Sequence, residues 1–292
     1  MRQHLGPVLA GPDLSFVLEA HNGLSAKIVE ASGFDAVWAS GLAISASLGV
    51  RDANEASWTQ VLEVVEFMVD AVEIPILFDG DSGFGNFNNV RRLVRKLCQR
   101  SVAGVCIEDK VFPKLNSFCN GSQVLASQDE FIGKLKAAKD SQTDARFCVV
   151  ARTEALIAGR SLGEALDRAH AYSEAGADAV LVHSKQADAR EVLAFAEAWN
   201  RRGPLVVVPT TYGAATPTDA FRAAGITTVI WANHMLRAGI AAMQHVARQL
   251  FEGQSVAKID NEIASVNEVL ELIDMGELIE AERRYLPSGA PE

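Results

Sequence analysis

The stretch LGEALDRAHAYSEAGADAVLVH (162–183) holds one complete helix-to-strand unit, and the architecture follows from it. Its first part, 162–176, repeats apolar residues at helical spacing and ends in Gly176, a residue type that commonly terminates helices in a left-handed conformation. The second part, 178–183, is short and almost continuously apolar, as in a parallel strand buried on both faces. A helix that leads through glycine into such a strand is typical of α/β proteins.

The same unit recurs along the chain. Gly33 and Gly225 each stand four residues before an apolar valine, as Gly176 does, and Ser101 takes the glycine's place in a fourth copy. Apolar runs follow these positions, and four further runs have the same character. We therefore predict eight strands, at 16–20, 35–40, 74–79, 103–109, 147–153, 178–183, 204–210 and 227–233.

Eight strands separated by segments long enough for helices favour a closed (β/α)8 TIM barrel. An open dinucleotide-binding sheet would need GxGxxG after an early strand, whereas the first strand is followed by HNGLSAK (21–27). We expect a single barrel domain over 1–292. Further helical stretches at 238–253 and 259–286 exceed what a barrel needs, so we expect 254–292 to form a C-terminal helical extension.

Composition narrows the function. The formal net charge of −10 argues against general nucleic-acid binding, which needs a basic surface. The N-terminus lacks a charged start followed by a long apolar stretch, and no run reaches membrane-spanning length, so we expect a cytoplasmic protein without a membrane partner. The four cysteines fit no zinc-site spacing, and Cys106 and Cys148 are expected in the core.

Polar residues end most of the predicted strands. Chemistry in α/β barrels occurs at the carboxyl ends of the strands, and these ends converge in a closed barrel. We therefore expect the strand-end side chains to line one site. In chain order they are Ser40, Asp79, Asp81, Glu108, Asp109, Arg152, Glu154, His183, Thr210, Thr211 and Asn233.

Three of these residues, Asp79, Asp81 and Glu108, would share a small volume. Like charges held together cost free energy unless they protonate or bind a cation. Oxygen ligands without Cys or His favour Mg²⁺ or Mn²⁺ over zinc. In the alternative interpretation, one or two of the acids pair with arginine or cap a helix.

Arg152 and His183 come from the two following units, and positive charge on both would face the acids across the barrel mouth. Such a site suits a small substrate with an enolate or 2-oxo group on the metal and a second anionic group on the Arg–His side. As alternatives, Arg152 forms a salt bridge with Glu154 or another strand-end acid, and His183 is a hydrogen-bonded core residue.

Two loops complete the candidate site. The loop 79–90 holds three glycines and three asparagines and is suited to cradling phosphate through backbone N–H groups, although it lacks the P-loop signature. The segment 110–130 is long and without periodicity, as lids often are, and Lys114, Asn116 and Ser117 would be its polar tips. An ordinary solvated loop is the alternative.

In these motifs the chain resembles the phosphoenolpyruvate mutase and isocitrate lyase superfamily, and its mutase branch in particular. The resemblance covers nearly the whole chain. The matching segments are EAHNGLSAKIV (19–29), WASGLAISASLGVRDANEASWTQV (38–61), DGDSGFGNFNNVRRLVRKL (79–97), EDKVFPKLNS (108–117), ARTEALIAG (151–159) and VHSKQAD (182–188).

The resemblance implies three groups of functional residues. Mg²⁺, with Mn²⁺ as a substitute, would be bound by Asp79 with support, partly through water, from Asp52, Asp81 and Glu108. Substrate would be bound by residues around the second strand end and by the lid, namely Trp38, Ser40, Gly41, Leu42 and Ser117. The catalytic residues would be Asp52, Lys114, Asn116, Arg152 and His183.

The resemblance also implies the reaction and the assembly. Phosphoenolpyruvate and phosphonopyruvate would be interconverted, which forms the P–C bond of phosphonate biosynthesis. A phosphonopyruvate decarboxylase would consume the product. The last barrel helix would be exchanged between subunits of a homodimer or homotetramer.

The lid sequence separates the alternatives within the superfamily. Lyases carry K-[KR]-C-G-H, whereas this chain reads KLNSF (114–118) and has Asn116 in place of the catalytic cysteine. Phosphonopyruvate hydrolases tend to have Thr there, so Asn116 followed by Ser117 favours the mutase over the hydrolase, and both over a C–C lyase of 2-oxo or 2-hydroxy acids. Beyond Ser117 the stretch 119–127 lacks the Gly-Arg pair of mutases. The set of acids, arginine and histidine is intact, which disfavours a non-enzymatic binding or scaffold protein.

Overall fold

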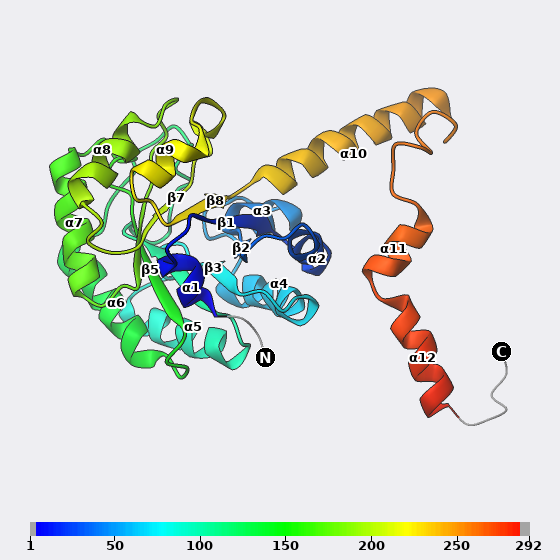
Figure 1. Ribbon diagram of the computed structural model, residues 1–292, viewed down its shortest axis with the longest axis horizontal. Helices are drawn as coiled ribbons and strands as arrows, with labels where there is room; N and C mark the ends of the chain where they lie inside the picture. The colour runs from blue at the N-terminus through cyan, green and yellow to red at the C-terminus, as the bar shows by residue number, and fades with distance from the viewer. Residues whose placement is uncertain (1–3, 287–292) are drawn as a thin grey trace. The chain divides into compact units, whose positions relative to one another are not determined.

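The computed structural model describes residues 4–286, and its larger part is a closed barrel of eight parallel strands in chain order (Figure 1). The last strand closes the ring by pairing with the first. All eight predicted strands and the TIM-barrel class are confirmed. The strands are β1 (Ser15–Ala20), β2 (Ala36–Ala39), β3 (Ile76–Asp79), β4 (Gly104–Glu108), β5 (Cys148–Thr153), β6 (Ala179–Val182), β7 (Leu205–Val207) and β8 (Thr228–Trp231).

Helices connect the strands and surround the barrel (Figure 1). The helix predicted at 162–176 is confirmed as α7, and residues 58–71 form α4. Serine caps fix where both begin, because Ser57 and Ser161 each accept a hydrogen bond from a backbone N–H in the first turn. The helices of this unit are α1 (Leu5–Ala10), α2 (Gly23–Ala31), α3 (Gly41–Ser47), α4 (Trp58–Ala71), α5 (Phe87–Gln99), α6 (Gln128–Ser141), α7 (Leu162–Glu174), α8 (Arg190–Trp199), the 3-10 turn η1 (Gly213–Ala215) and α9 (Thr218–Ala223).

The glycines that were expected to end helices have left-handed backbones. Gly33, Gly176 and Gly225 have φ angles of 83°, 102° and 76°. Ser101 takes the same role with a φ of 57°, although a side chain disfavours this conformation. The repeated helix-to-strand turn is therefore kept even where the sequence lacks its usual residue.

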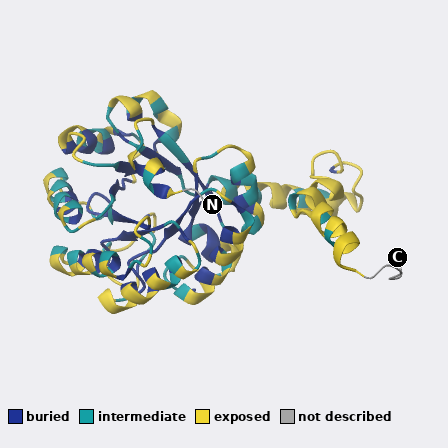
Figure 2. Cartoon of the chain, turned by 60° about the horizontal axis from the view of Figure 1, so that its bottom comes forward, coloured by how far each residue is buried: buried dark blue, intermediate teal, exposed yellow. Residues whose placement is uncertain are grey.

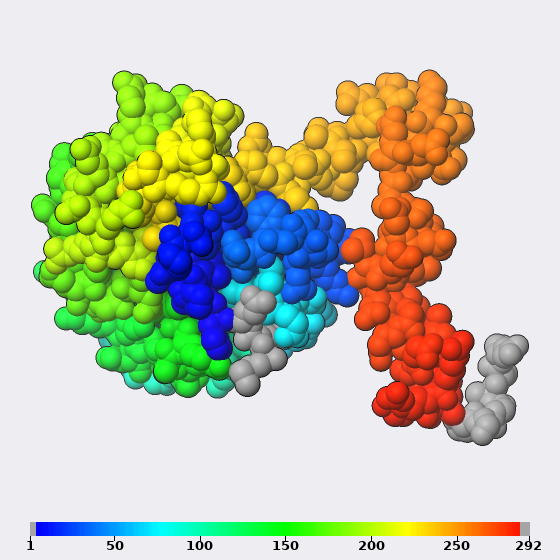
Figure 3. Space-filling view, in the orientation of Figure 1, coloured from blue at the N-terminus to red at the C-terminus, as the bar shows by residue number. Residues whose placement is uncertain are grey.

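Apolar side chains fill the barrel, and α1 closes its amino-terminal end. Leu5 belongs to the same buried cluster as Trp38 and Leu77 of the barrel wall, and it packs against Gly104 at the start of β4. The strands are almost wholly buried, whereas the surrounding helices expose their outer faces (Figure 2). In the space-filling view the amino-terminal segment lies across the barrel face turned to the viewer (Figure 3). With this end covered, the carboxyl ends of the strands remain for a site.

Two cysteines, Cys106 and Cys148, are buried as expected and unbonded to sulfur. Both lie in strands, at the middle of β4 and the start of β5. Burial raises the pKa of the Cys148 thiol to about 12, and it also raises the pKa of the Cys106 thiol well above its usual value. Both thiols are therefore protonated packing residues.

The described residues after Leu236 form a second compact unit. It contains most of α10 (His234–Gly253), followed by α11 (Val266–Leu272) and α12 (Met275–Tyr285). The helical stretch predicted at 259–286 is confirmed for α11 and α12, but residues 259–262 form turns, and Asp274 separates the two helices with a left-handed φ of 60°. No helix within residues 4–286 is both long enough and apolar enough to cross a membrane.

Candidate active site

A pocket of about 480 Å³ lies at the carboxyl ends of the strands. The pocket is formed by the strand ends, by Ser40–Leu42 at the start of α3 and by the lid. The structure therefore brings together most of the residues selected from the sequence. Gly41, Asp81 and Glu108 adjoin the lining through contacts described below. The pocket is lined by Trp38, Ser40, Leu42, Asp52, Asp79, Lys114, Asn116, Ser117, Phe118, Arg152, His183, Val208, Thr210, Ala232 and Asn233.

The start of α3, with Ser40 as its N-cap, positions the first acid of the site. Ser40 caps α3 by accepting a hydrogen bond from Ala43 N at 3.2 Å, and Gly41 N donates to Asp79 Oδ2 at 3.0 Å. A Cβ atom at Gly41 would lie 3.1 Å from Asp79 Oδ2 and 3.2 Å from Asp81 Oδ1. Two carboxylates therefore converge on one backbone position that leaves no comfortable room for a side chain.

The acids at the ends of β3 and β4 form a strained and crowded group. Asp81 has a left-handed φ of 47°, and its carboxylate accepts from Asn54 Nδ2 at 2.7 Å. Burial raises the Asp81 pKa to about 7; Asp79, Asp52 and Glu108 add to this, and Lys114 opposes it. Backbone strain of this kind persists where the surrounding structure enforces it, often at functional sites.

Glu108 is a buried acid with one unsatisfied oxygen. Its Oε2 lies 3.3 Å from Arg152 Nε, whereas its Oε1 has no hydrogen-bond partner among the described residues. Burial raises the Glu108 pKa, against the pull of Arg152. A buried carboxylate oxygen without a partner is costly, so this atom marks a place where a cation or an ordered water fits.

Lys114 and Asn116 of the lid both bind Asp52. Lys114 Nζ lies 2.6 Å from Asp52 Oδ1 and 2.9 Å from Asp81 Oδ1, and Asn116 Nδ2 donates to Asp52 Oδ2 at 2.5 Å. Burial alone would lower the Lys114 pKa, but Asp81 and Asp52 hold it well above its usual value. The ammonium group is therefore charged, and its ion pairs with Asp52 and Asp81 hold the lid against the acidic side of the pocket.

Arg152 and His183 lie close together, and both bind Glu154. Glu154 Oε1 accepts from Arg152 Nε at 2.6 Å and lies 2.7 Å from His183 Nδ1. The alternative considered for Arg152, a salt bridge with strand-end acids, is confirmed for Glu154 and Glu108. Burial alone would raise the Glu154 pKa, but Arg152 and His183 hold it well below its usual value, so Glu154 is ionised.

The charge of His183 differs from the expectation. Burial and the neighbouring Arg152 lower its pKa below the usual value, although Glu154 acts in the opposite direction. The prediction of a second positive charge is therefore wrong near neutral pH. His183 Nδ1 lies between the Glu154 carboxylate, which can only accept, and Arg152 Nη2 at 2.8 Å, which can only donate. Both contacts are on the Nδ1 side of the ring, and His183 lines the pocket.

The predicted lid is a loop whose two ends pair with each other. Lys110 pairs with Leu125 in an isolated antiparallel bridge, and Val111 N donates to Val124 O at 3.1 Å. At the tip, the Phe118 ring meets His183 edge-on at a centroid distance of 5.7 Å. Phe118 was missed as a lining residue, although its place directly after the polar tips was a usable signal.

Two further residues of the site, Asn54 and Lys110, were not selected from the sequence. Asn54 joins the lid to the acids, since its Oδ1 accepts from Lys114 N at 2.7 Å while its Nδ2 donates to Asp81. Lys110 lies fully buried beneath the lid. Asn54 lies in the segment 38–61 and Lys110 in the segment 108–117, so the family resemblance carried a signal for both.

Comparisons with known proteins agree with this geometry. Residues 8–251 match the family model described as phosphoenolpyruvate phosphomutase. The chain is 56% identical over 280 residues to the phosphoenolpyruvate phosphomutase of Tetrahymena pyriformis, covering 96% of this chain and 93% of that protein. Its fold matches the crystal structure of a phosphoenolpyruvate phosphomutase from Streptomyces platensis subsp. rosaceus with a TM-score of 0.94 and 44% identity, over 97% of this chain and 98% of the other. A phosphonopyruvate hydrolase in complex with oxalate and Mg²⁺ matches with a TM-score of 0.91 and 38% identity, over 97% and 98% of the two chains.

Proposed function

The chain belongs to the phosphoenolpyruvate phosphomutase family, and from this premise we propose that it interconverts phosphoenolpyruvate and phosphonopyruvate. In this isomerisation phosphorus moves between the enol oxygen and the terminal carbon of one pyruvate skeleton. One observation carries the proposal: in a single pocket, a group of carboxylates faces a mostly buried guanidinium–imidazole pair under a lid. The acidic side suits a cation with the enolate, and the opposite side suits the phosphoryl group.

We propose that Asp79 binds Mg²⁺, with Asp81, Glu108 and Asp52 in support through water. Among residues 4–286, no three acidic, histidine or cysteine side chains form a ready-made metal cage. Mg²⁺ does not need such a cage, because it keeps several waters and uses only one or two carboxylates. The unpartnered Glu108 Oε1 and the all-oxygen donor set fit it, and Mn²⁺ is the expected substitute. When bound, the metal supplies positive charge for the enolate oxygen and the carboxylate of the substrate.

Gly41→Ala is expected to weaken Mg²⁺ binding by about tenfold, since disturbing groups that orient ligands typically costs 10–100-fold. The added methyl group would press on the Asp79 and Asp81 carboxylates. Calorimetric titration with Mg²⁺ measures the change. Gly133→Ala on α6, where an added Cβ meets nothing within 4 Å, is the matched control. Equal Mg²⁺ affinity in Gly41→Ala and wild type would contradict this placement of the metal.

The chain's own residues on the other side would hold the phosphoryl group. Phosphoryl transfer passes through a loose transition state in which position and charge matter more than covalent chemistry. Arg152 and Asn116 both line the pocket and offer donors to the phosphoryl oxygens, and His183 Nε2 offers a third once the imidazole is protonated. The transferring group then stays in place while the enolate turns, and carbon meets phosphorus in place of oxygen.

Asp52 is assigned a supporting role in this proposal. Both of its carboxylate oxygens are already engaged, one by Lys114 and one by Asn116. Pairing with the Lys114 ammonium makes the carboxylate less nucleophilic, so this arrangement favours electrostatic support and lid anchoring over covalent capture. The Phe118 ring at the lid tip adds an apolar cover that disfavours water as the phosphoryl acceptor.

Binding of a phosphonate is expected to protonate His183. The imidazole is neutral because its pKa is lowered, and a dianionic group beside Nε2 would raise that pKa. Calorimetry with phosphonoacetate in buffers of different ionisation enthalpy reports the proton balance, and His183→Asn corrects for the ligand's own titration. Wild type should take up as much as one proton more per bound ligand than the variant between pH 7 and 8, and identical balances would contradict the assignment.

Phosphorus NMR tests the function directly. Purified protein with phosphonopyruvate and Mg²⁺ should convert the phosphonate signal to that of phosphoenolpyruvate, and excess EDTA should stop the conversion. Release of free phosphate would instead identify a hydrolase. No change in either resonance, with or without chelator, would reject both.

We also propose the assembly and the metabolic place implied by the family. The C-terminal unit exposes apolar side chains along α10, α11 and α12, including Phe251, Val266 and Ile279, which suits packing against another subunit. A homodimer or homotetramer with exchanged helices would cover them, and sedimentation equilibrium measures this. The equilibrium favours the enol phosphate, so a cytoplasmic decarboxylase acting on phosphonopyruvate would draw the reaction forward.

A further inference from the structure

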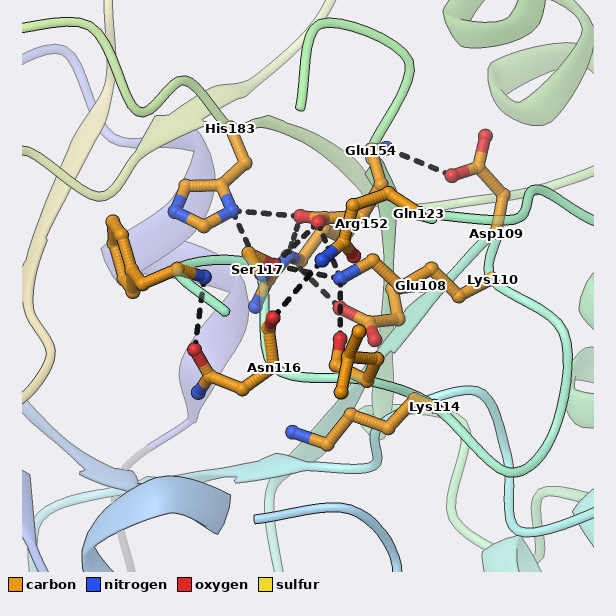
Figure 4. A network of polar contacts seen from close by, with 12 residues as sticks. Glu108, Asp109, Lys110, Lys114, Asn116, Ser117, Gln123, Arg152, Glu154 and His183 are labelled. Carbon is orange, nitrogen blue, oxygen red and sulfur yellow. Dashed lines mark hydrogen bonds and ion pairs between the residues drawn. The ribbon is translucent and has the colours of Figure 1, made fainter. Parts of the chain in front are cut away.

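Glu154 occupies the centre of a buried polar cluster behind the pocket (Figure 4). One oxygen, Oε1, binds Arg152 and His183 as described. The other, Oε2, accepts from Ser117 Oγ at 2.6 Å and lies 2.9 Å from Lys110 Nζ. A single carboxylate therefore holds the two residues of the phosphoryl side with one oxygen and the lid with the other.

Lys110 strengthens the lid side of this cluster. Its ammonium group donates to Ser117 Oγ at 2.7 Å and to Leu115 O at 2.9 Å. Lys114 and Asn116 alternate with these residues along the lid and face Asp52 instead. The lid segment is thus held on two sides, by Asp52 toward the acids and by Glu154 with Lys110 toward the phosphoryl side.

We propose that Glu154 is a positioning residue that couples closure of the lid to the placement of Arg152 and His183. The inference rests on the proposed function, because it concerns the phosphoryl side of that same site. Neither Glu154 nor Lys110 lines the pocket, so both act through residues that do. Ser117 docks fully only where Oε2 is held in place by the bonds that Oε1 makes to Arg152 and His183. Lid closure and assembly of the phosphoryl site then occur together.

Glu154→Gln tests this coupling, because it keeps the side-chain shape and removes the charge. The lid should open more often, and since closure contributes to both binding and turnover, kcat should fall at least about tenfold while KM for phosphonopyruvate rises about tenfold. A merely structural role would reduce the active fraction and lower kcat alone. Glu154→Asp keeps the charge and should restore part of the loss in both constants.

Ser117→Ala provides a second variant that removes only one hydroxyl group from the lid side. If Glu154 acts through Ser117, the double variant should lose much less than the product of the two single losses. Hydrogen exchange over residues 111–125, measured in Mg²⁺ and oxalate, should accelerate in both single variants. Glu66→Gln on α4, which removes the charge from an exposed pair with Arg100, is the matched control.

Unchanged lid exchange in Glu154→Gln, or fully multiplicative losses in the double variant, would overturn the coupling. If Glu154→Gln does not fold, Ser117→Ala alone decides, and lid exchange equal to that of wild type rejects the proposal. The exchange measurement needs no turnover. A wild-type protein that closes its lid over oxalate but leaves phosphonopyruvate unchanged would therefore contradict the proposed function and not this inference.

Discussion

Replacing Asp79 by alanine is expected to lower turnover by about 10³-fold or more and to leave the barrel folded. A metal ion contributes several kcal/mol of charge stabilisation to a transition state, and about 4 kcal/mol corresponds to roughly 10³-fold in rate. Asp79 is the one acid of the β3 and β4 ends that lines the pocket, which makes it the direct ligand in the proposal. The fold should survive because the change removes one of several crowded negative charges.

Three measurements decide this first prediction. Phosphorus NMR gives the rate, circular dichroism gives the thermal midpoint, and calorimetry gives the Mg²⁺ affinity, which should be lost. Asp140→Ala, at an exposed position of α6, controls for the loss of an acid elsewhere and should leave all three values unchanged. An Asp79→Ala protein that keeps more than roughly a tenth of the wild-type rate would exclude its metal role.

The barrel could be predicted because its repeating unit is local. Helical spacing, a left-handed residue and a short apolar run recur within about twenty-five residues, and each part has its own physical signal. The break at Asp274 could not be predicted, because apolar spacing continues across it and nothing nearby distinguishes this aspartate from a helical one. The left-handed conformation of Ser101 shows the converse: there the repeated unit overrides the preference of the residue.

The part of the site that lies at the strand ends could be predicted from the sequence. Convergence of parallel strands places Asp79, Arg152 and His183 around one pocket, whatever the loops do. The contacts of Asp52 with Lys114 and Asn116 span more than sixty residues and depend on two loop conformations, which no periodicity encodes. For Asp52, Lys114 and Asn116, the family resemblance and the lid pattern were the only guides.

The prediction of a positive charge on His183 was wrong for a related reason. A strand-end histidine in an anion site is expected to be cationic. The pKa of His183 is lowered instead, by burial and by Arg152 beside it. Neither is visible in the sequence, where Glu154 looked mainly like a partner for Arg152. The structure shows one carboxylate that serves the arginine, the histidine and the lid together.

Arg152→Lys is the second change with a large expected effect, a loss of about 10³-fold in kcat/KM. Lysine keeps the positive charge between Glu108 and Glu154, so the two acids remain compensated and the fold should persist. What disappears is the planar guanidinium, whose Nε donates to Glu154 while further donors of the same group serve the phosphoryl oxygens. Losing one preorganised donor typically costs 10²–10³-fold, and arginines acting on phosphoryl groups contribute 10³–10⁵-fold.

The measurement must separate this geometric loss from a loss of stability. Arg168→Lys is the matched control, because Arg168 is also a mostly buried arginine and binds Asp109 and Glu164 outside the pocket. Both variants should lose some thermal stability, but only Arg152→Lys should lose phosphoryl chemistry while keeping its Mg²⁺ affinity. An Arg152→Lys protein with more than about a tenth of the wild-type kcat/KM would mean that charge alone suffices, since a lysine cannot reproduce the guanidinium geometry. Equal losses of activity in the two variants would place the effect in the fold and remove Arg152 from the phosphoryl side.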